Sequence, residues 1–334
     1  MAGLMESNQS GRRQDLADLI AVADAKGTPF TTMIKKGKDL VNSLFTWQAD
    51  SLSDPNTDGA LDGKDVADYE NAAENRAELS NRLQIFQRTA KVSTLSQVVS
   101  DVAGVGKGKE MARAKAKKLQ EVKRDMEATF LSDNDAQAQS GINPYKTRGL
   151  GSWIQNSAQS YLPVPEVYRT PAASINTTAM SSFAESDLQN VLKSIYEQTG
   201  VRKRLVLLCG STLKSKISDF TKWQPGVSSS IAAIRTYNQD AKSKMIMATV
   251  DFYEGDFAEL ELIPDLFLAV GSNSTIRNAR GYVIDPDDVE LRYGELPNVK
   301  DLPDGGGGER CLIRAIAGLA VGNPLNNGKF AATA

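Results

Sequence analysis

Apolar residues recur at two different periods along the chain. A helical period, with apolar positions three and four residues apart, is clearest at Leu119, Val122, Met126 and Phe130. A single apolar stripe at this spacing is typical of an amphipathic helix. Later in the chain, residues 205–208 form a continuous apolar run, and apolar and acidic residues alternate between residues 258 and 262. Both patterns are typical of strands. The chain is therefore predicted to combine helices in one stretch with strands in another.

The stripe belongs to a long helix predicted over residues 93–132. It begins at a capping box, in which the Thr94 hydroxyl and the Gln97 amide satisfy backbone N–H groups. Gly104, Gly106 and Gly108 interrupt it, and clustered glycines favour a kink. A phosphate-binding loop is not indicated there, because the glycine and lysine spacing fits neither common phosphate-loop motif.

Shorter helices are predicted on both sides of this one. An amphipathic helix around residues 16–22 carries Leu16, Leu19, Ile20 and Val22, and Gly27-Thr28-Pro29 ends it. A second is expected over residues 31–44. A third begins at Ser186 and ends at Gly200. A β-meander with a turn at residues 253–256 is predicted over residues 244–270.

Opposite charges concentrate in two separate stretches. Residues 50–80 hold nine acidic and two basic side chains, a net charge of −7, and few large apolar residues. Such a segment cannot build its own core. Strand-like residues 44–48 and 83–87 flank it, so we expect a two-stranded excursion with an acidic tip. Residues 107–124 hold eight basic and two acidic side chains, a net charge of +6. We predict that the two stretches meet across a subunit boundary, with one set of side chains facing the other: Asp50, Asp54, Asp58, Asp62, Asp65, Asp68 and Glu70 against Lys115, Lys117, Lys118, Lys123 and Arg124.

The acidic tip also resembles a calcium-binding loop. Oxygen-bearing side chains occupy the ligand positions of an EF-hand, with Gly59 at the sixth position: Asp54, Asn56, Asp58, Asp62 and Asp65. The preceding residues 44–52 do not look helical, as an EF-hand requires, and Pro55 is awkward at the second position. An acidic turn rich in turn-forming residues is the alternative interpretation.

Composition excludes several kinds of active site. The 334 residues include no histidine, so histidine-based nucleophilic triads and histidine metal sites are excluded. Cys209 and Cys311 are too few for a four-cysteine metal site. The near-neutral net charge of −2 argues against a dedicated DNA-binding protein. Carboxylates at Glu259 and Glu261 look solvent-facing, and Asp285, Asp287 and Asp288 look like turn residues.

We therefore expect that the protein is not an enzyme and needs no cofactor. We also expect no signal peptide and no membrane-spanning segment.

Several short stretches, spread over most of the chain, carry a resemblance to one family of known proteins. Their order along the chain makes the resemblance specific. They are Thr28-Pro29-Phe30 before Phe45-Thr46-Trp47, Asn81-Arg82-Leu83 running into Val92-Ser93-Thr94, Glu121-Val122-Lys123, Val250-Asp251-Phe252, and Tyr282-Val283-Ile284. In this order they resemble the Hong Kong 97-type major capsid proteins of tailed bacteriophages.

The resemblance implies an α+β fold of the Hong Kong 97 type and a division of the chain into named parts. Residues 1–45 are expected to form an N-terminal arm and residues 46–92 an extended β-hairpin loop. Residues 93–179 would form the peripheral domain, with its spine helix at 93–132. Residues 180–300 would form mostly the axial domain with part of the peripheral sheet, and residues 301–334 would return to the periphery.

The implied function is that of a major capsid protein. The resemblance implies pentamers and hexamers that form an icosahedral head shell around double-stranded DNA. Scaffolding, portal and decoration proteins are possible partners, no membrane is involved, and assembly takes place in the host cytoplasm before the chain becomes part of the virion. Three alternatives stay open: an encapsulin-like compartment shell, a nucleic-acid-binding module using residues 107–124, and a carboxylate- or calcium-dependent enzyme.

Overall fold

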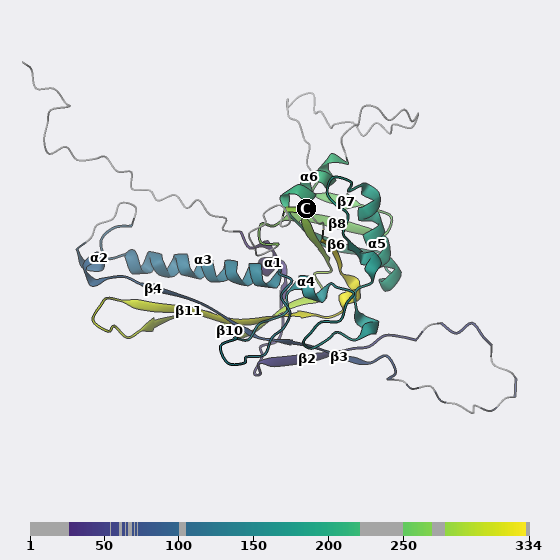
Figure 1. The fold of residues 1–334 in the computed structure, drawn as a ribbon, viewed down its shortest axis with the longest axis horizontal. Helices are drawn as coiled ribbons and strands as arrows, with labels where there is room; N and C mark the ends of the chain where they lie inside the picture. Colours follow the sequence, from purple (N-terminus) through teal and green to yellow (C-terminus); the bar gives the residue numbers. More distant parts are fainter. Residues whose placement is uncertain are drawn as a thin grey trace, which may run out of the picture.

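A long helix lies along one face of a narrow sheet, and a second sheet with its own helices sits at one end of this layer (Figure 1). The computed structural model describes residues 27–53, 55–59, 62–63, 65, 69, 71, 73–99, 105–220, 250–268 and 278–331. The expected helix around residues 16–22 lies outside these residues. Among the described residues, no helix is both long and apolar enough to span a membrane.

The elongated layer consists of helix α3 (Glu110–Phe130) on a four-stranded sheet. The sheet has the order β1-β10-β11-β4, and its strands are β1 (Lys35–Lys36), β10 (Val289–Leu302), β11 (Arg310–Val321) and β4 (Gln84–Lys91). β11 pairs antiparallel with both β10 and β4. The predicted stripe of α3 supplies the buried Val122, Met126 and Phe130. Burial of this stripe holds α3 on the sheet.

The two faces of β11 have different neighbours. Ala315 pairs with Phe86 of β4, whose ring packs edge-on against Phe130 of α3 with centroids 5.8 Å apart. Because side chains alternate along a strand, the odd-numbered residues of β11 face α3 and the even-numbered ones face away. Ala320 and Ile316 on the far face pack with Phe45.

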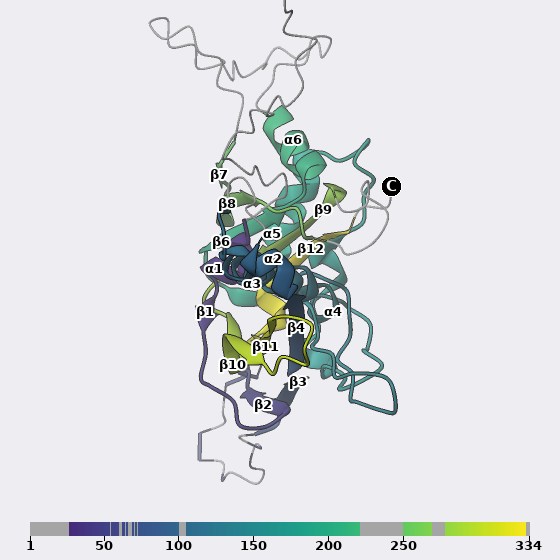
Figure 2. The ribbon, with the colours of Figure 1, turned by 90° about the vertical axis from the view of Figure 1, so that its left-hand side faces the viewer.

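Phe45 belongs to a two-stranded arm that leaves the layer on this far side. The arm pairs β2 (Leu44–Ala49) antiparallel with β3 (Ala77–Arg82). Figures 1 and 2 both show β2 and β3 on the opposite side of the sheet from α3. The arm then runs outward, away from the elongated layer.

The compact unit contains a six-stranded sheet of order β5-β12-β9-β6-β8-β7. Its strands are β5 (Ile175–Asn176), β12 (Gly328–Ala331), β9 (Arg280–Ile284), β6 (Lys203–Cys209), β8 (Ala258–Pro264) and β7 (Phe252–Glu254). Helices α5 (Glu185–Thr199) and α6 (Ser211–Asp219) pack against it. α5 ends at Gly200, which has a φ of 66° and closes the helix as predicted. The β7–β8 hairpin confirms two strands of the predicted β-meander, but its turn lies at residues 255–257 and not at 253–256. Residues 244–249 lie outside the described part.

Short elements complete the chain. They are α1 (Pro29–Met33), α2 (Thr94–Val98), α4 (Leu150–Trp153), and the 3-10 helices η2 (Glu166–Tyr168), η3 (Ala172–Ser174) and η4 (Pro324–Asn326). Tyr282 of β9 donates a hydrogen bond to the Leu131 carbonyl (3.1 Å), and Lys329 of β12 pairs with Asp133 (2.6 Å). These contacts join the compact unit to the C-terminal end of α3.

Three predicted elements differ from the structure. The helix expected over residues 31–44 is wrong: α1 ends at Met33, and β1 pairs in parallel with β10 instead. The predicted helix over residues 93–132 is two helices, α2 and α3, and the described residues 105–109 between them are not helical. The partner of the strand at residues 44–49 is residues 77–82. Residues 83–87 mostly belong to β4, which pairs with β11.

Candidate assembly surfaces

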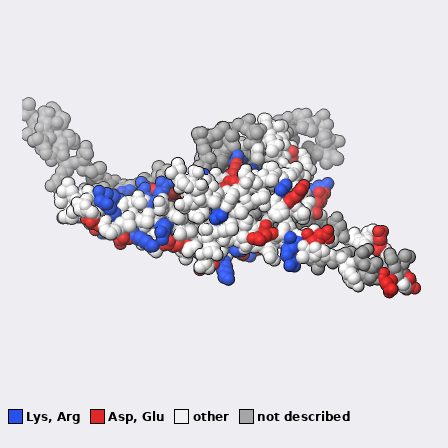
Figure 3. Space-filling model, turned by 60° about the horizontal axis from the view of Figure 1, so that its bottom comes forward, with Lys and Arg blue, Asp and Glu red and all other residues white. Residues whose placement is uncertain are grey.

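The acidic side chains of the arm lie exposed at its outer end. Asp58, Asp62 and Asp65 are exposed, and Asp50 pairs with Arg76 (3.3 Å) just beyond the outer ends of β2 and β3. Asp54, Asp68 and Glu70 lie outside the described residues. Figure 3 shows acidic side chains along the arm and basic ones gathered at the opposite end of the molecule. The arm therefore presents negative charge well away from the chain's own basic surface.

The calcium-loop interpretation gains no support from the geometry. The Asn56 side chain accepts a hydrogen bond from the Asp58 backbone N–H (2.8 Å), which is the local bonding of a turn. The chain enters the loop through strand β2, where an EF-hand has a helix. Among the described residues, no group of three or more Cys, Asp or Glu side chains is placed to hold a metal ion.

The predicted cations of α3 fall into two groups. Lys115 pairs with Asp301 of β10 (2.6 Å), Lys118 pairs with Glu121 (2.6 Å), and the Arg124 guanidinium lies 5.6 Å from the centre of the Phe267 ring. These three cations are engaged within the chain. Lys117 and Lys123 are exposed. They are the α3 cations best placed to meet another molecule.

A second basic surface lies on the side of the sheet opposite α3. It is formed by β4, β11 and β10, where neighbouring strands place four cations on one face: Lys91, Lys300, Arg310 and Arg314. Glu295 shares this face and pairs with Arg314 (2.6 Å) and Lys300 (3.7 Å). We call these residues the basic sheet face. Sequence reasoning missed it because the four cations come together only when the strands pair in this register.

The root of the arm is fixed by buried polar contacts. Asn81 is fully buried; its amide donates to the Leu319 carbonyl (2.6 Å) and accepts from the Arg148 backbone N–H (2.9 Å). The Arg148 guanidinium lies over the Trp153 ring (4.6 Å to its centre) and donates to Asp135 (2.9 Å). Hydrogen bonds between buried groups are strengthened by the low local dielectric and favour a single arrangement of the groups that they join. The arm therefore leaves the layer in a defined direction.

The N-terminal helix α1 is held by a buried carboxyl group. Glu127 of α3 is fully buried and accepts hydrogen bonds from the backbone N–H groups of Phe30 (2.7 Å) and Thr31 (2.8 Å). Burial, together with the charge of Asp265 beside it, raises the pKa of Glu127 to about 8. Burial also raises the pKa of Asp265. The pair therefore holds a proton at neutral pH and links α1, α3 and the end of β8.

The carboxylates weighed earlier as acid–base candidates are engaged in ion pairs. Asp285 pairs with Lys203 (2.7 Å), Asp287 contacts Lys35, and Glu261 pairs with Arg204 (2.9 Å). Both cysteines are buried, and burial raises the pKa of Cys209 to about 12. A thiol with so high a pKa is a poor nucleophile. The ion pairs and the buried thiols are thus engaged in contacts within the fold.

Solved structures share this arrangement of elements. A structure from Mycobacterium phage Adephagia has a TM-score of 0.62 at 10% identity, covering 100% of this chain and 99% of the other. The capsid asymmetric unit of Cyanophage A-1(L) has a TM-score of 0.62 at 11% identity, covering 98% and 99%. A structure from Gordonia phage Cozz has a TM-score of 0.59 at 13% identity, covering 99% of each chain. These similarities confirm the predicted Hong Kong 97-type capsid fold.

Sequence comparison leads to the same class of protein. The major capsid protein of Escherichia phage Phieco32 is 32% identical over 127 residues, which are 37% of this chain and 34% of that protein. The match thus spans about a third of the length of this curated relative. The family model of the SU10 major capsid protein matches residues 4–334. Since that match covers nearly the whole chain, the protein belongs to the SU10 major capsid protein family.

Proposed function

We propose that copies of this chain form pentamers and hexamers that close into an icosahedral head shell around double-stranded DNA. The observation that carries the proposal is the β2–β3 arm, whose fixed root and exposed acidic tip suit contact with a second copy. Contact between two different surfaces of identical chains forms a ring when the rotation from one copy to the next closes after a whole number of copies. The proposed role is structural and requires no catalytic group.

The proposal extends to the parts of the chain and to its partners. The elongated layer would be the peripheral domain, the compact unit the axial domain, and residues 1–45 the N-terminal arm. The β2–β3 arm would be the extended loop. Of residues 301–334, predicted to return to the periphery, β11 lies in the elongated layer, whereas β12 lies in the sheet of the compact unit. Packaged DNA would contact the inner face, with scaffolding, portal and decoration proteins as further partners. Assembly would take place in the host cytoplasm.

Sedimentation velocity on the purified chain at low and high salt tests this function. We expect boundaries of capsomer or shell mass at low salt. A chain that stays monomeric at all salt concentrations, and also when supplied with a scaffolding protein, contradicts the proposal.

The acidic tip has two candidate docking surfaces on a neighbouring copy. One is the basic face of α3, as predicted from the sequence, now reduced to the exposed Lys117 and Lys123. The other is the basic sheet face, where Lys91 and Lys300 are exposed. The two surfaces lie on opposite sides of the elongated layer.

The side of the elongated layer from which the arm starts favours the basic sheet face as its docking surface. Phe45, at the arm root, packs on the far face of β11, opposite α3. Neighbours in a shell are related by rotation about axes that cross the shell, so every copy keeps the same side outward. An arm on the sheet side of one copy therefore meets the sheet side of the next. We propose that the acidic tip docks on the basic sheet face of a neighbouring copy.

Matched double charge reversals separate the two surfaces. Lys91→Glu/Lys300→Glu alters two exposed lysines of the sheet face, and Lys117→Glu/Lys123→Glu alters two of α3. We expect only the sheet-face pair to abolish capsomers at low salt, and Asp58→Lys/Asp62→Lys/Asp65→Lys to restore them in that background. If capsomers were lost only in Lys117→Glu/Lys123→Glu, the result would instead support the basic face of α3, which was predicted from the sequence. Unchanged assembly of both variants would refute charge pairing of the arm.

A further inference from the structure

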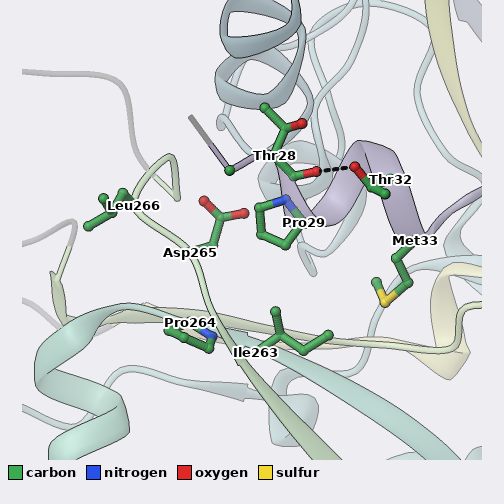
Figure 4. A pocket seen from close by; sticks show the side chains of 9 residues that line it. Thr28, Pro29, Thr32, Met33, Ile263, Pro264, Asp265 and Leu266 are labelled. Carbon is green, nitrogen blue, oxygen red and sulfur yellow. Dashed lines mark hydrogen bonds between the residues drawn. The ribbon is translucent and has the colours of Figure 1, made fainter. Parts of the chain in front are cut away.

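A mostly apolar groove lies between α1 and the end of β8 (Figure 4). It has a volume of about 680 Å³. Pro29, Thr32 and Met33 form one wall, and Ile263, Pro264, Asp265 and Leu266 form the other. Leu266 is 52% exposed, and the Thr32 hydroxyl is occupied by its hydrogen bond to the Thr28 carbonyl (2.7 Å). The groove therefore offers apolar surface with few free polar groups.

Both walls of the groove are held in place by the chain itself. The carboxyl group of Glu127 fixes α1 through the Phe30 and Thr31 amides, and the Phe30 side chain is fully buried. The other wall is fixed where the Asp265 backbone N–H donates to the Cys209 carbonyl (3.0 Å) and Asp265 Oδ1 accepts from the Phe267 N–H (2.7 Å). A groove with fixed walls is prepared for a ligand, because binding requires little reordering.

We propose that this groove binds residues 16–22 of the same chain, folded back as a helix onto α1. The sequence gives that segment an apolar stripe of Leu16, Leu19, Ile20 and Val22, with Asp18 and Ala21 on the opposite face of the helix. The described chain begins inside the groove, since Gly27 and Thr28 line it. The segment that directly precedes the groove in the sequence thus carries an apolar face that can cover the apolar surface of the groove.

The length of the connection favours docking within one chain. Between a helix ending near Ala23 and the start of α1 at Pro29 lie five residues, 24–28. Loops of about 2–5 residues join the two antiparallel helices of an αα-hairpin. Five residues reach at most about 17 Å, while the five-residue α1 is about 8 Å long. The segment is therefore tethered at the groove, and closing so short a loop costs little entropy. A segment from another copy has to compete with this tethered one.

Disulfide trapping in the unassembled full-length chain tests the proposal. Leu266→Cys is combined in turn with cysteine at three stripe positions, Leu16, Leu19 and Ile20, and with matched controls on the opposite face at Asp18 and Ala21. The native cysteines are buried and common to all variants. We expect at least one stripe position to form an intrachain disulfide tenfold faster than either control. Equal rates overturn the proposal, and a disulfide found only between chains overturns the assignment to the same chain.

Hydrogen exchange supplies a second readout that does not depend on disulfide geometry. We expect the amides of residues 16–22 to be protected in the intact chain and to lose that protection in Leu266→Asp. Leu266 is half-exposed, so this substitution leaves the compact unit folded, as protection of β6 will report. Amides 16–22 that exchange at the unprotected rate in the intact chain overturn the proposal. Both measurements use the unassembled protein, so neither depends on whether a shell forms.

Discussion

The two sheets of the molecule differ in how many of their faces the chain itself covers. In β6 of the six-stranded sheet, residues 205–209 are all buried. Leu207 points into the core beneath α5 and α6, and Leu208 points to the core shared with α3. In β11 of the four-stranded sheet, residues facing α3 are buried, whereas Leu312 and Arg314 on the other face are only half-buried. The compact unit is complete within one chain, and the elongated layer keeps one face available for another copy.

The β2–β3 arm shows the same difference between a part that the chain itself buries and a part that it leaves exposed. Its root contains the buried Phe45, Leu79 and Asn81, while Asp58 and Asp62 farther out are exposed. Intrachain packing therefore fixes the direction of the arm, and in our proposal a neighbouring copy holds its tip. Substitutions that affect folding should concentrate in the first group of residues, and substitutions that affect assembly in the second.

Truncating one leucine on each sheet gives the largest expected difference. Leu207→Ala removes a fully buried side chain of β6, at an expected cost of about 2–5 kcal/mol. Leu312→Ala on the free face of β11 should cost about 1 kcal/mol, because that side chain already contacts water. Urea midpoints of the unassembled chain measure both. Equal losses would contradict the view that the two sheets differ in coverage.

Much of this contrast was predictable from local patterns. Continuous apolar residues at 205–208 predicted the fully buried strand, and the stripe at Leu119, Val122, Met126 and Phe130 predicted α3 with its buried face. The scarcity of apolar residues between 50 and 80 predicted a segment without its own core. In each case the pattern is repeated over several residues, so one local rule decides the structure.

The remaining features depend on contacts between distant segments. Residues 77–82 and 83–87 are both compatible with strands, so the sequence could not decide which of them pairs with residues 44–49. Lys35 and Lys36 became a strand only through pairing with β10. Glu127 stood among exposed helix charges in the sequence. One signal could have identified it: it lies between Met126 and Phe130, beside the apolar stripe.

The buried Glu127 makes the attachment of α1 dependent on pH. The folded chain keeps the Glu127 proton up to about pH 8, whereas the unfolded chain releases it near 4.5. Between these values the folded state binds more protons, so the free energy of unfolding should fall as pH rises, by up to about 1.4 kcal/mol per pH unit. Urea midpoints between pH 5 and 8.5 measure this slope. Glu127→Gln should flatten it, and an equally steep slope in that variant would assign the effect to other groups.

Removing Asn81 should loosen the root of the arm. Asn81→Ala leaves the Leu319 carbonyl and the Arg148 N–H without their partner, and each unsatisfied buried group costs about 1–3 kcal/mol. Hydrogen exchange of β2 and β3 should accelerate most, because these strands depend on this anchor. Ser80→Ala, a half-buried neighbour in the same strand, is the control. Unchanged exchange in Asn81→Ala would mean that Phe45 and Leu79 hold the root without the polar contacts.

The smallest expected effect concerns the ion pair between the sheet and α3. Arg88 of β4 donates two hydrogen bonds to Asp125, at 2.6 and 2.7 Å, with both side chains partly exposed. Such pairs contribute up to about 1 kcal/mol, and salt screens them. A double-mutant cycle with Arg88→Ala and Asp125→Ala should give a coupling of that size at low salt and less at 1 M salt. A larger, salt-independent coupling would mean that polar contacts, and not the apolar stripe, position α3 on its sheet. Both faces of the four-stranded sheet would then make mainly polar contacts. Burial of apolar side chains would no longer explain why α3 covers one face while the other is proposed to bind a neighbouring copy.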